Sequence, residues 1–182
     1  GGASTEITLV RNRHITKSVS LPIGALTLTG TYQKGDEYTP KELDKLTKVV
    51  KKTIKEHTWL RNVKLPLLGI GGTARNIAKM DQRKLSYPIT KLHNYEIPHH
   101  RFHEILEEVK GKSLEERKKI SGLSSERADI IIAGLTIVEE LFNYVNTKTL
   151  VVGGCGLREG LFYDYYGEHY LGGNSIIDDI LV

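Results

Sequence analysis

Three glycine-rich segments are the parts of this sequence best suited to hold a phosphate group. They are Gly1-Gly2-Ala3-Ser4-Thr5, Gly69-Ile70-Gly71-Gly72-Thr73 and Gly153-Gly154-Cys155-Gly156. Glycine lets backbone N–H groups approach an anion closely, and a helix that begins just after such a turn adds the favourable end of its dipole. Each segment alone is more typical of an ordinary turn, and none is a P-loop or a complete GxGxxG motif. Together, however, they predict an anion site.

Several side chains near these segments could complete that site. Ser4 and Thr5 carry hydroxyls, Glu6 carries a carboxylate, and Arg158 offers a fork of N–H donors that matches phosphate oxygens. Arg75, one turn into the helix expected after the second segment, could reach the same anion. Each has a structural alternative: a strand-edge charge for Glu6, an ion pair for Arg158 and a solvated helix charge for Arg75.

Four histidines, His93, His99, His100 and His103, form a cluster in the sequence. His99 and His103 have the i,i+4 spacing of a helical metal pair, but no HExxH pattern and no third ligand accompanies them. Exposed or capping histidines are therefore the favoured interpretation. Cys155 has no His or acid nearby in the sequence that would activate it, which favours a small buried filler.

Two further groups of residues are better explained by structure than by binding. An aromatic run could stack nucleobases, but core packing is favoured, and a lysine-rich helix face is typical of a solvated surface rather than of a polyphosphate track. The aromatic residues are Phe162, Tyr163, Tyr165 and Tyr166, and the lysines are Lys48, Lys51, Lys52 and Lys55.

Composition bounds the class of protein. The chain has 182 residues, 39% of them apolar, which is enough for one domain with a real core. No apolar run is long enough to span a bilayer and no signal-peptide pattern is present, so we expect no membrane partner. A single cysteine fits a reducing cytoplasm. The net charge of +4 permits an anionic ligand but does not indicate specific nucleic-acid binding.

The elements that must position these residues can be read from the pattern of apolar positions. Alternation over residues 6–11 and 14–21 predicts an antiparallel hairpin, and residues 26–32 could add a third strand. A helix should follow, with a capping box at Thr39 and Glu42. Residues 64–72 read as a buried strand.

The second half of the chain is mainly helical in pattern. A helix should begin at Pro98, Ser113 and Glu116 should form a second capping box, and residues 125–145 should form the most buried helix. Residues 148–154 read as a core strand. The order predicts a mixed α/β fold in which helices cover a sheet.

The glycine segments and two further motifs resemble one known family. GGASTE is similar to the later part of the phosphate loop DIGGGSTE of the exopolyphosphatase/guanosine-pentaphosphate phosphohydrolase (Ppx/GppA) family. GIGGTARNIA resembles its second glycine turn, ERKKISGLSSERADIIIAG its central helical signature, and GGCGLREGLFYDYYG its closing GLREG turn. The likeness covers roughly residues 1–166. It implies a ribonuclease-H-like lobe of the actin, sugar-kinase and chaperone superfamily, with a mixed sheet flanked by helices.

The resemblance also implies a division of labour. Residues 1–182 correspond to the second, C-terminal lobe of a two-lobed phosphatase domain, and the first lobe, with the catalytic Glu, lies outside this sequence. This lobe would bind phosphate and would be inactive alone. The phosphate-binding positions it implies are Gly1, Gly2, Ala3, Ser4, Thr5, Gly71, Gly72, Thr73, Gly156 and Arg158, with Glu6 near Mg²⁺ as the metal residue.

Some positions depart from the family pattern or have other roles. Ala3 replaces a family glycine, and the Asp that often precedes the closing turn is absent. Arg127 and Asp129 are expected to form a buried pair that supports the fold, and Glu159 to hold Arg158 or cap its helix.

The expected activity is release of terminal phosphate from inorganic polyphosphate or from guanosine pentaphosphate in the cytoplasm. The alternatives are a non-catalytic module that senses polyphosphate or guanosine pentaphosphate/tetraphosphate and, more remotely, a sugar or acetate kinase. The sequence leaves the choice of substrate open, and a homodimer is possible.

Overall fold

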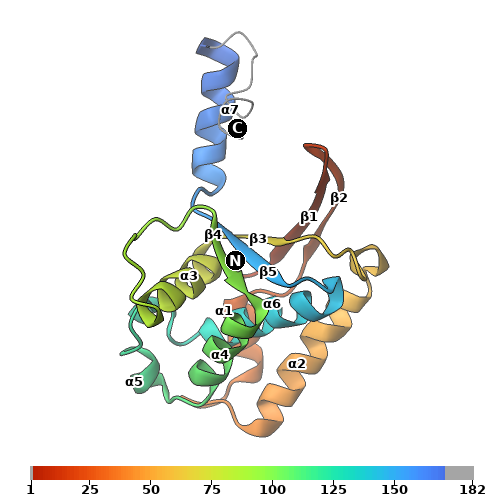
Figure 1. Cartoon of the computed structure of the whole chain (residues 1–182). Coiled ribbons are helices and arrows are strands. Elements are labelled where there is room, and N and C mark those ends of the chain that lie inside the picture. The colour runs from red at the N-terminus through yellow and green to blue at the C-terminus, as the bar shows by residue number, and fades with distance from the viewer. Residues whose placement is uncertain (1, 171–182) are drawn as a thin grey trace.

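The computed structural model describes residues 2–170, and Gly1 and residues 171–182 lie outside the described part. Figure 1 shows the arrangement of the elements. The strands are β1 (Thr5–Arg11), β2 (His14–Leu21), β3 (Leu67–Ile70), β4 (Tyr95–Pro98) and β5 (Thr149–Gly153). The helices are α1 (Ala25–Tyr32), α2 (Pro40–Lys55), α3 (Gly72–Lys84), α4 (His99–Lys110), α5 (Leu114–Arg117), α6 (Ile131–Val145) and α7 (Leu157–Tyr170). Two 3-10 turns span Thr58–Leu60 and Ser125–Arg127.

The predicted hairpin is present. β1 and β2 pair antiparallel, with Thr5 opposite Leu21 and a bulge at Leu9/Val10. The two residues of the connecting turn, Asn12 and Arg13, have φ angles of 49° and 64°. Positive φ at both positions matches the right-handed twist of the flanking strands, so the local sequence closes this hairpin.

The second sheet places the glycine turns. Its strand order is β3-β5-β4, with β3 parallel to β5 and β4 antiparallel to it. α3 contacts all three strands and α4 contacts β4, so these helices cover one face of the sheet. Because β3 and β5 are parallel neighbours, the turns that follow them must emerge at the same edge.

α6 is the most buried helix, as predicted, and it packs against α1, α2, α3 and α4. The stripe Leu46, Val50 and Ile54 of α2 is buried, and both predicted capping boxes form. The fold is therefore the expected mixed α/β arrangement. Within the part of the chain that the structure describes, no helix is long and apolar enough to cross a membrane.

Two predicted elements were wrong in type or environment. Residues 26–32 belong to α1 rather than to a third strand, and Leu28 packs in the core while Leu26 is exposed. β3 forms as predicted but is not buried on both faces, because Leu68 and Ile70 are 63% and 60% exposed. Figure 1 shows that α7 projects from the body as the hairpin does.

Candidate phosphate-binding site

The second and third glycine segments lie side by side. Ile70, the last residue of β3, pairs with Gly153, the last residue of β5. α3 begins directly after the first of these strands and α7 three residues after the second. A Cβ added to Gly153 would lie 3.1 Å from Cγ1 of Ile70. Two segments far apart in the sequence therefore meet at one edge of the sheet, as the anion-site prediction requires.

The second glycine turn leads directly into the N-terminus of α3. Gly71 has φ 108° and ψ −172°, a conformation that only glycine adopts without strain. No side chain caps α3, and the N–H groups of Gly72, Thr73 and Ala74 have no partner among the described residues. Three free donors at the positive end of a helix dipole form a favourable environment for an oxyanion.

Arg127 lies directly against this turn. A Cβ on Gly72 would overlap the Arg127 guanidinium, so the glycine is what lets the cation approach the start of α3. The expected buried pair of Arg127 with Asp129 was wrong. Asp129 is exposed, and the described residues show no ion pair between the two. The Arg127 guanidinium therefore lies beside the free N–H groups with no ion-pair partner in the part of the chain that the structure describes.

Asn76 holds the segment that carries Arg127. Its Nδ2 donates to the carbonyl oxygen of Gly72 at 2.8 Å, and its Oδ1 accepts from the N–H of Ser124 at 2.7 Å. The side chain is 5% exposed, so both bonds are shielded from water. The role of Asn76 was not predicted from the sequence, because α3 also buries the polar residues Asp81 and Gln82 and its pattern does not distinguish Asn76 from them.

The third turn is closed by two side chains. The N–H of Gly154 donates to Nδ1 of His93 at 3.2 Å, and the N–H of Gly156 donates to Oε2 of Glu159 at 2.7 Å. The bond from Gly156 is the main cause that lowers the pKa of Glu159, so this carboxylate is ionised and caps α7, one of the two roles expected for it. Since Gly156 donates internally, its N–H is not available to a phosphate.

Arg158 and Arg75 both lie near Glu159. Arg158 precedes Glu159 in the chain, and Arg75 also helps to lower the pKa of that carboxylate, so the first turn of α3 lies near the first turn of α7. Arg158 is exposed and has no ion-pair partner among the described residues. Arg127 thus lies against the second turn, while Arg75 and Arg158 belong to the first turns of the two helices that follow the glycine segments.

The first glycine segment is held by α1. The carbonyl oxygen of Gly2 accepts from the N–H groups of Leu26 and Thr27 at 3.0 and 3.1 Å. The Thr5 hydroxyl donates to the carbonyl oxygen of Ile23 at 2.6 Å, so it is already engaged. The N–H groups of Gly2 and Ala3 have no partner among the described residues, whereas Gly1 lies outside them.

Glu6 presents an ionised carboxylate on β1. Its Oε1 accepts from the hydroxyls of Ser4 and Ser20, and these bonds lower the pKa of Glu6. Its Oε2 has no partner among the described residues. One free, hard oxygen suits a Mg²⁺ ion that takes its other ligands from water and phosphate. Within the same residues, no group of three or more His, Cys, Asp or Glu side chains could hold a metal.

The remaining sequence candidates lie elsewhere or differ from expectation. His99 and His103 contact the Glu139 carboxylate at 2.9 and 3.4 Å, where His99 also stacks on Phe142, so they join α4 to α6. Cys155 is exposed rather than buried. The aromatic run on α7 is exposed as well, with Phe162 at 61%, so core packing was the wrong interpretation within the described residues. The four lysines of α2 are solvated as predicted.

Comparison with known proteins adds independent information. The sequence profile of the Ppx/GppA phosphatase family matches residues 1–169. Exopolyphosphatase 2 of Mycobacterium tuberculosis is 28% identical over 145 residues, which are 78% of this chain and 44% of that protein. A bifunctional 3-dehydroquinate synthase/phosphatase of Fusobacterium nucleatum is 28% identical over 155 residues, which are 84% of this chain and 23% of that protein. The chain thus spans less than half the length of these relatives.

Solved structures give the same result at the level of the fold. The Aquifex aeolicus member of the Ppx/GppA family has a TM-score of 0.80 and 27% identity, over 93% of this chain and 55% of that one. An exopolyphosphatase from Cytophaga hutchinsonii has a TM-score of 0.82 at 20% identity, over 91% and 54%, and shows the fold alone.

Proposed function

Because the chain belongs to the Ppx/GppA phosphatase family, we propose that it is the phosphate-holding lobe of a phosphohydrolase that releases terminal phosphate from a phosphoanhydride substrate. Its fold is the ribonuclease-H-like lobe of the actin-like superfamily, as expected from the motifs. The observation that carries the proposal is the junction of the second and third glycine turns, where Arg127 lies against the free end of α3 and Arg158 stands in the first turn of α7.

The geometry suits stabilisation of charge during phosphoryl transfer. That reaction needs little covalent chemistry from the protein, and most of the catalysis is positioning and electrostatic stabilisation. The N–H groups of Gly72 and Thr73 would bind the oxygens of the transferred phosphoryl group. The guanidinium groups of Arg127 and Arg158 would neutralise the charge that spreads over those oxygens.

The first segment would contribute through its backbone and through Glu6. The N–H groups of Gly2 and Ala3 are available to phosphate, whereas the Ser4 and Thr5 hydroxyls already donate to other acceptors. Glu6 would hold Mg²⁺ through Oε2, directly or through water, while Ser4 and Ser20 keep the carboxylate ionised and oriented. The bound ion would supply charge neutralisation at the phosphate oxygens.

Activation of the attacking water requires a group that the described residues do not offer near the turns. Glu159 is committed to the Gly156 N–H, and its lowered pKa makes it a weak base. We therefore assign the general base to the other half of the full-length protein, in agreement with the length of the relatives. Inorganic polyphosphate and guanosine pentaphosphate are both suitable substrates, and the name of the mycobacterial relative favours polyphosphate.

The test is the Arg158→Ala variant in the full-length protein, assayed for phosphate release from polyphosphate and from guanosine pentaphosphate with Mg²⁺. Loss of a charged contact costs about 1.5–3 kcal/mol, so kcat/KM should fall at least about tenfold. Arg61→Ala is the control, because Arg61 is an exposed arginine that follows the Thr58–Leu60 turn.

Two results would change the proposal. Unchanged kinetics in the Arg158→Ala variant would remove this arginine from the site. Tight binding of either substrate without any phosphate release by the full-length protein would favour the alternative, a regulatory module that senses these anions.

A further inference from the structure

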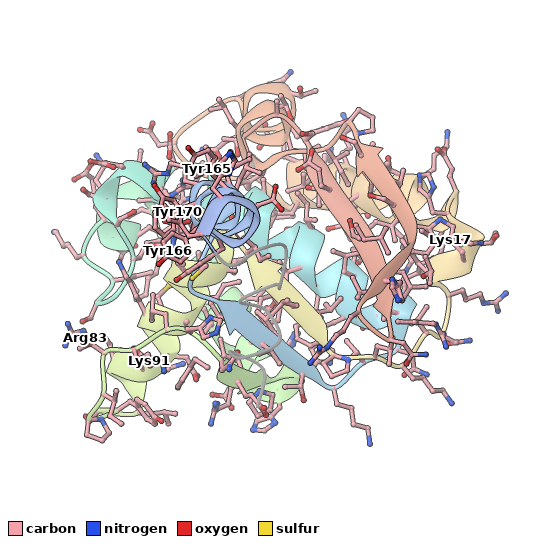
Figure 2. The ribbon with its side chains drawn as sticks, turned by 90° about the horizontal axis from the view of Figure 1, so that it is seen from above. Lys17, Arg83, Lys91, Tyr165, Tyr166 and Tyr170 are labelled. Carbon is pink, nitrogen blue, oxygen red and sulfur yellow. The ribbon has the colours of Figure 1, made fainter. Side chains whose placement is uncertain are left out.

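A hollow with a basic rim lies away from the glycine turns. It has a volume of about 400 Å³ and is formed where α3, α4 and α5 end or begin. α3 starts at the second glycine turn and reaches the hollow with its last residues, so the two features are separated by its 13 residues, about 20 Å. Figure 2 shows Arg83, at that far end, at one edge of the molecule.

Three cations of this rim form no direct ion pair among the described residues. Arg83, Lys112 and Lys119 line the hollow, and none has a hydrogen-bond or ion-pair partner through its side chain among the described residues. Lys112 and Lys119 both help to lower the pKa of Glu116, so both ammonium groups lie in the electrostatic surroundings of that carboxylate. One carboxylate shared by two cations leaves an excess of positive charge.

The carboxylates at the hollow are already engaged. Glu108 forms an ion pair with Lys84 at 3.1 Å. Glu116 accepts from the N–H and the hydroxyl of Ser113 at 2.8 and 2.9 Å, as the partner of its capping box. Four cations against two carboxylates leave two positive charges. The carbonyl ends of α3 and α4 offset part of this excess, since each helix end carries about half a charge.

The apolar floor of the hollow strengthens the attraction between this remaining positive charge and an anion. Met80, Ile105 and Val109 line it and are at most 4% exposed, so the base of the hollow is the hydrophobic core. A charge held against apolar atoms is less screened by water than one on an open surface. Lys112 is only partly exposed, which is consistent with a stem lying along this wall and an ammonium group at the rim.

From these contacts we propose that the hollow between α3, α4 and α5 is a second binding site, for a small multivalent oxyanion of the phosphate class. Arg83, Lys112 and Lys119 bind it from three sides. The site shares no residue with the glycine turns and does not rest on the proposed function. A ligand there would contact the end of α3 whose beginning forms the second turn, so it is placed to influence that turn.

The experiment uses tripolyphosphate as the probe and this 182-residue chain as the protein. Backbone amide resonances are followed by NMR during a titration at about 20 mM salt, where surface electrostatics are little screened. The amides of Lys112, Lys119 and Ser121 report on the hollow, and those of Gly72 and Thr73 report on the turn. We expect two groups of shifts with separate apparent affinities.

The variant replaces Arg83, Lys112 and Lys119 with glutamine. It should weaken binding at the hollow at least tenfold and leave the shifts at Gly72 in place. The matched control replaces three exposed lysines of α2 with glutamine, which removes the same charge, and should change affinity less than twofold. The control positions are Lys41, Lys45 and Lys52.

Two outcomes would overturn the proposal. If both triple variants weaken binding equally, the attraction is a property of net charge and not of this hollow. If the shifts of the unmodified chain are confined to the glycine turns, the hollow binds no anion of this class. If the variant loses binding at the hollow while the shifts at Gly72 stay unchanged, the proposed second site is supported, whether or not the protein has the proposed phosphohydrolase activity.

Discussion

Arg127 lies at the second glycine turn and not in the buried pair that the sequence predicted. Its guanidinium lies against Gly72, beside the free N–H groups of α3. We expect Arg127→Ala to weaken tripolyphosphate binding at the turn about tenfold or more, because a hydrogen bond to a charged group contributes about 1.5–3 kcal/mol. NMR shifts of Gly72 and Thr73 measure this site separately, and Arg61→Ala is the control. Equal affinity in both variants would exclude Arg127 from the site.

Glu140 gives a prediction about pH. It is 8% exposed on α6, and burial raises its pKa above the usual value for glutamate. At a pH between the unfolded-state pKa and the raised folded-state pKa, Glu140 is protonated in the folded chain but ionised in the unfolded chain. The stability contributed by Glu140 is therefore present below about pH 4.5 and is lost as pH rises through the folded pKa.

Glu140→Gln should consequently raise Tm at pH 7.5, by about 2–4 °C if the relief is near 1 kcal/mol. The difference from the unmodified chain should disappear near pH 4. Comparing the two proteins at each pH cancels the effect of carboxylates whose pKa is lowered, such as Glu42 and Glu116. A Tm difference that is constant between pH 4 and pH 8 would contradict this account.

Single residues differ in how far the sequence could place them. The capping partners of Thr39 and Ser113 were predictable, since a box closes over three residues of local chain. The positions of Arg127 and Cys155 were not. The first depends on a contact with Gly72, more than fifty positions away, and the second on a helix that leaves the body of the molecule.

At the scale of elements, the loop before Arg127 must cross very close to α3. Gly122 has φ 93°, and a Cβ there would lie 2.6 Å from the backbone carbonyl of Lys79 and the nitrogen of Met80. Backbone atoms cannot move aside as the end of a side chain can. Gly122→Ala should therefore lower the free energy of unfolding by about 2 kcal/mol or more, which corresponds to a fall in Tm of about 4–8 °C.

Gly30→Ala is the matched control for that substitution. Gly30 lies in α1, and nothing lies within 4 Å of an added Cβ. Alanine is the better helix former, so this change should raise stability by up to about 1 kcal/mol. Thermal unfolding followed by circular dichroism measures both. If the Gly122→Ala protein is as stable as the unmodified chain, the loop at Gly122 can move away from α3 without a loss of folding stability.

The elements that were predicted correctly have strong local signals, and those that were missed do not. The amphipathic stripe of α2 and the apolar length of α6 specify helices by themselves. β4 has only four residues and is a strand because it pairs with β5. α1 contains three threonines and a glycine, a composition that favours extended chain, yet its packing on α6 makes it a helix.

At the scale of the whole molecule, the described surface leaves large apolar side chains uncovered. Leu157, Phe162 and Tyr170 of α7 are 80%, 61% and 68% exposed, and Figure 2 shows Tyr165, Tyr166 and Tyr170 gathered around that helix. Exposed apolar surface of this extent marks an interaction site. Relatives about twice as long as this chain supply a reason for it, since their remaining half could cover α7.

The last prediction follows from the proposed assignment of the general base to the other half of the protein. The 182-residue chain alone should bind tripolyphosphate. It should release phosphate from polyphosphate or guanosine pentaphosphate at less than about one thousandth of the rate of the full-length protein, because general base catalysis contributes about 10²–10⁴-fold to the rate. Malachite-green detection of phosphate with Mg²⁺ measures both. The purified chain must also be assayed as Arg127→Ala, since a contaminating phosphatase would be indifferent to that change. Robust turnover that disappears in the variant would place a complete active site within these residues and refute the assignment of the base to the other half.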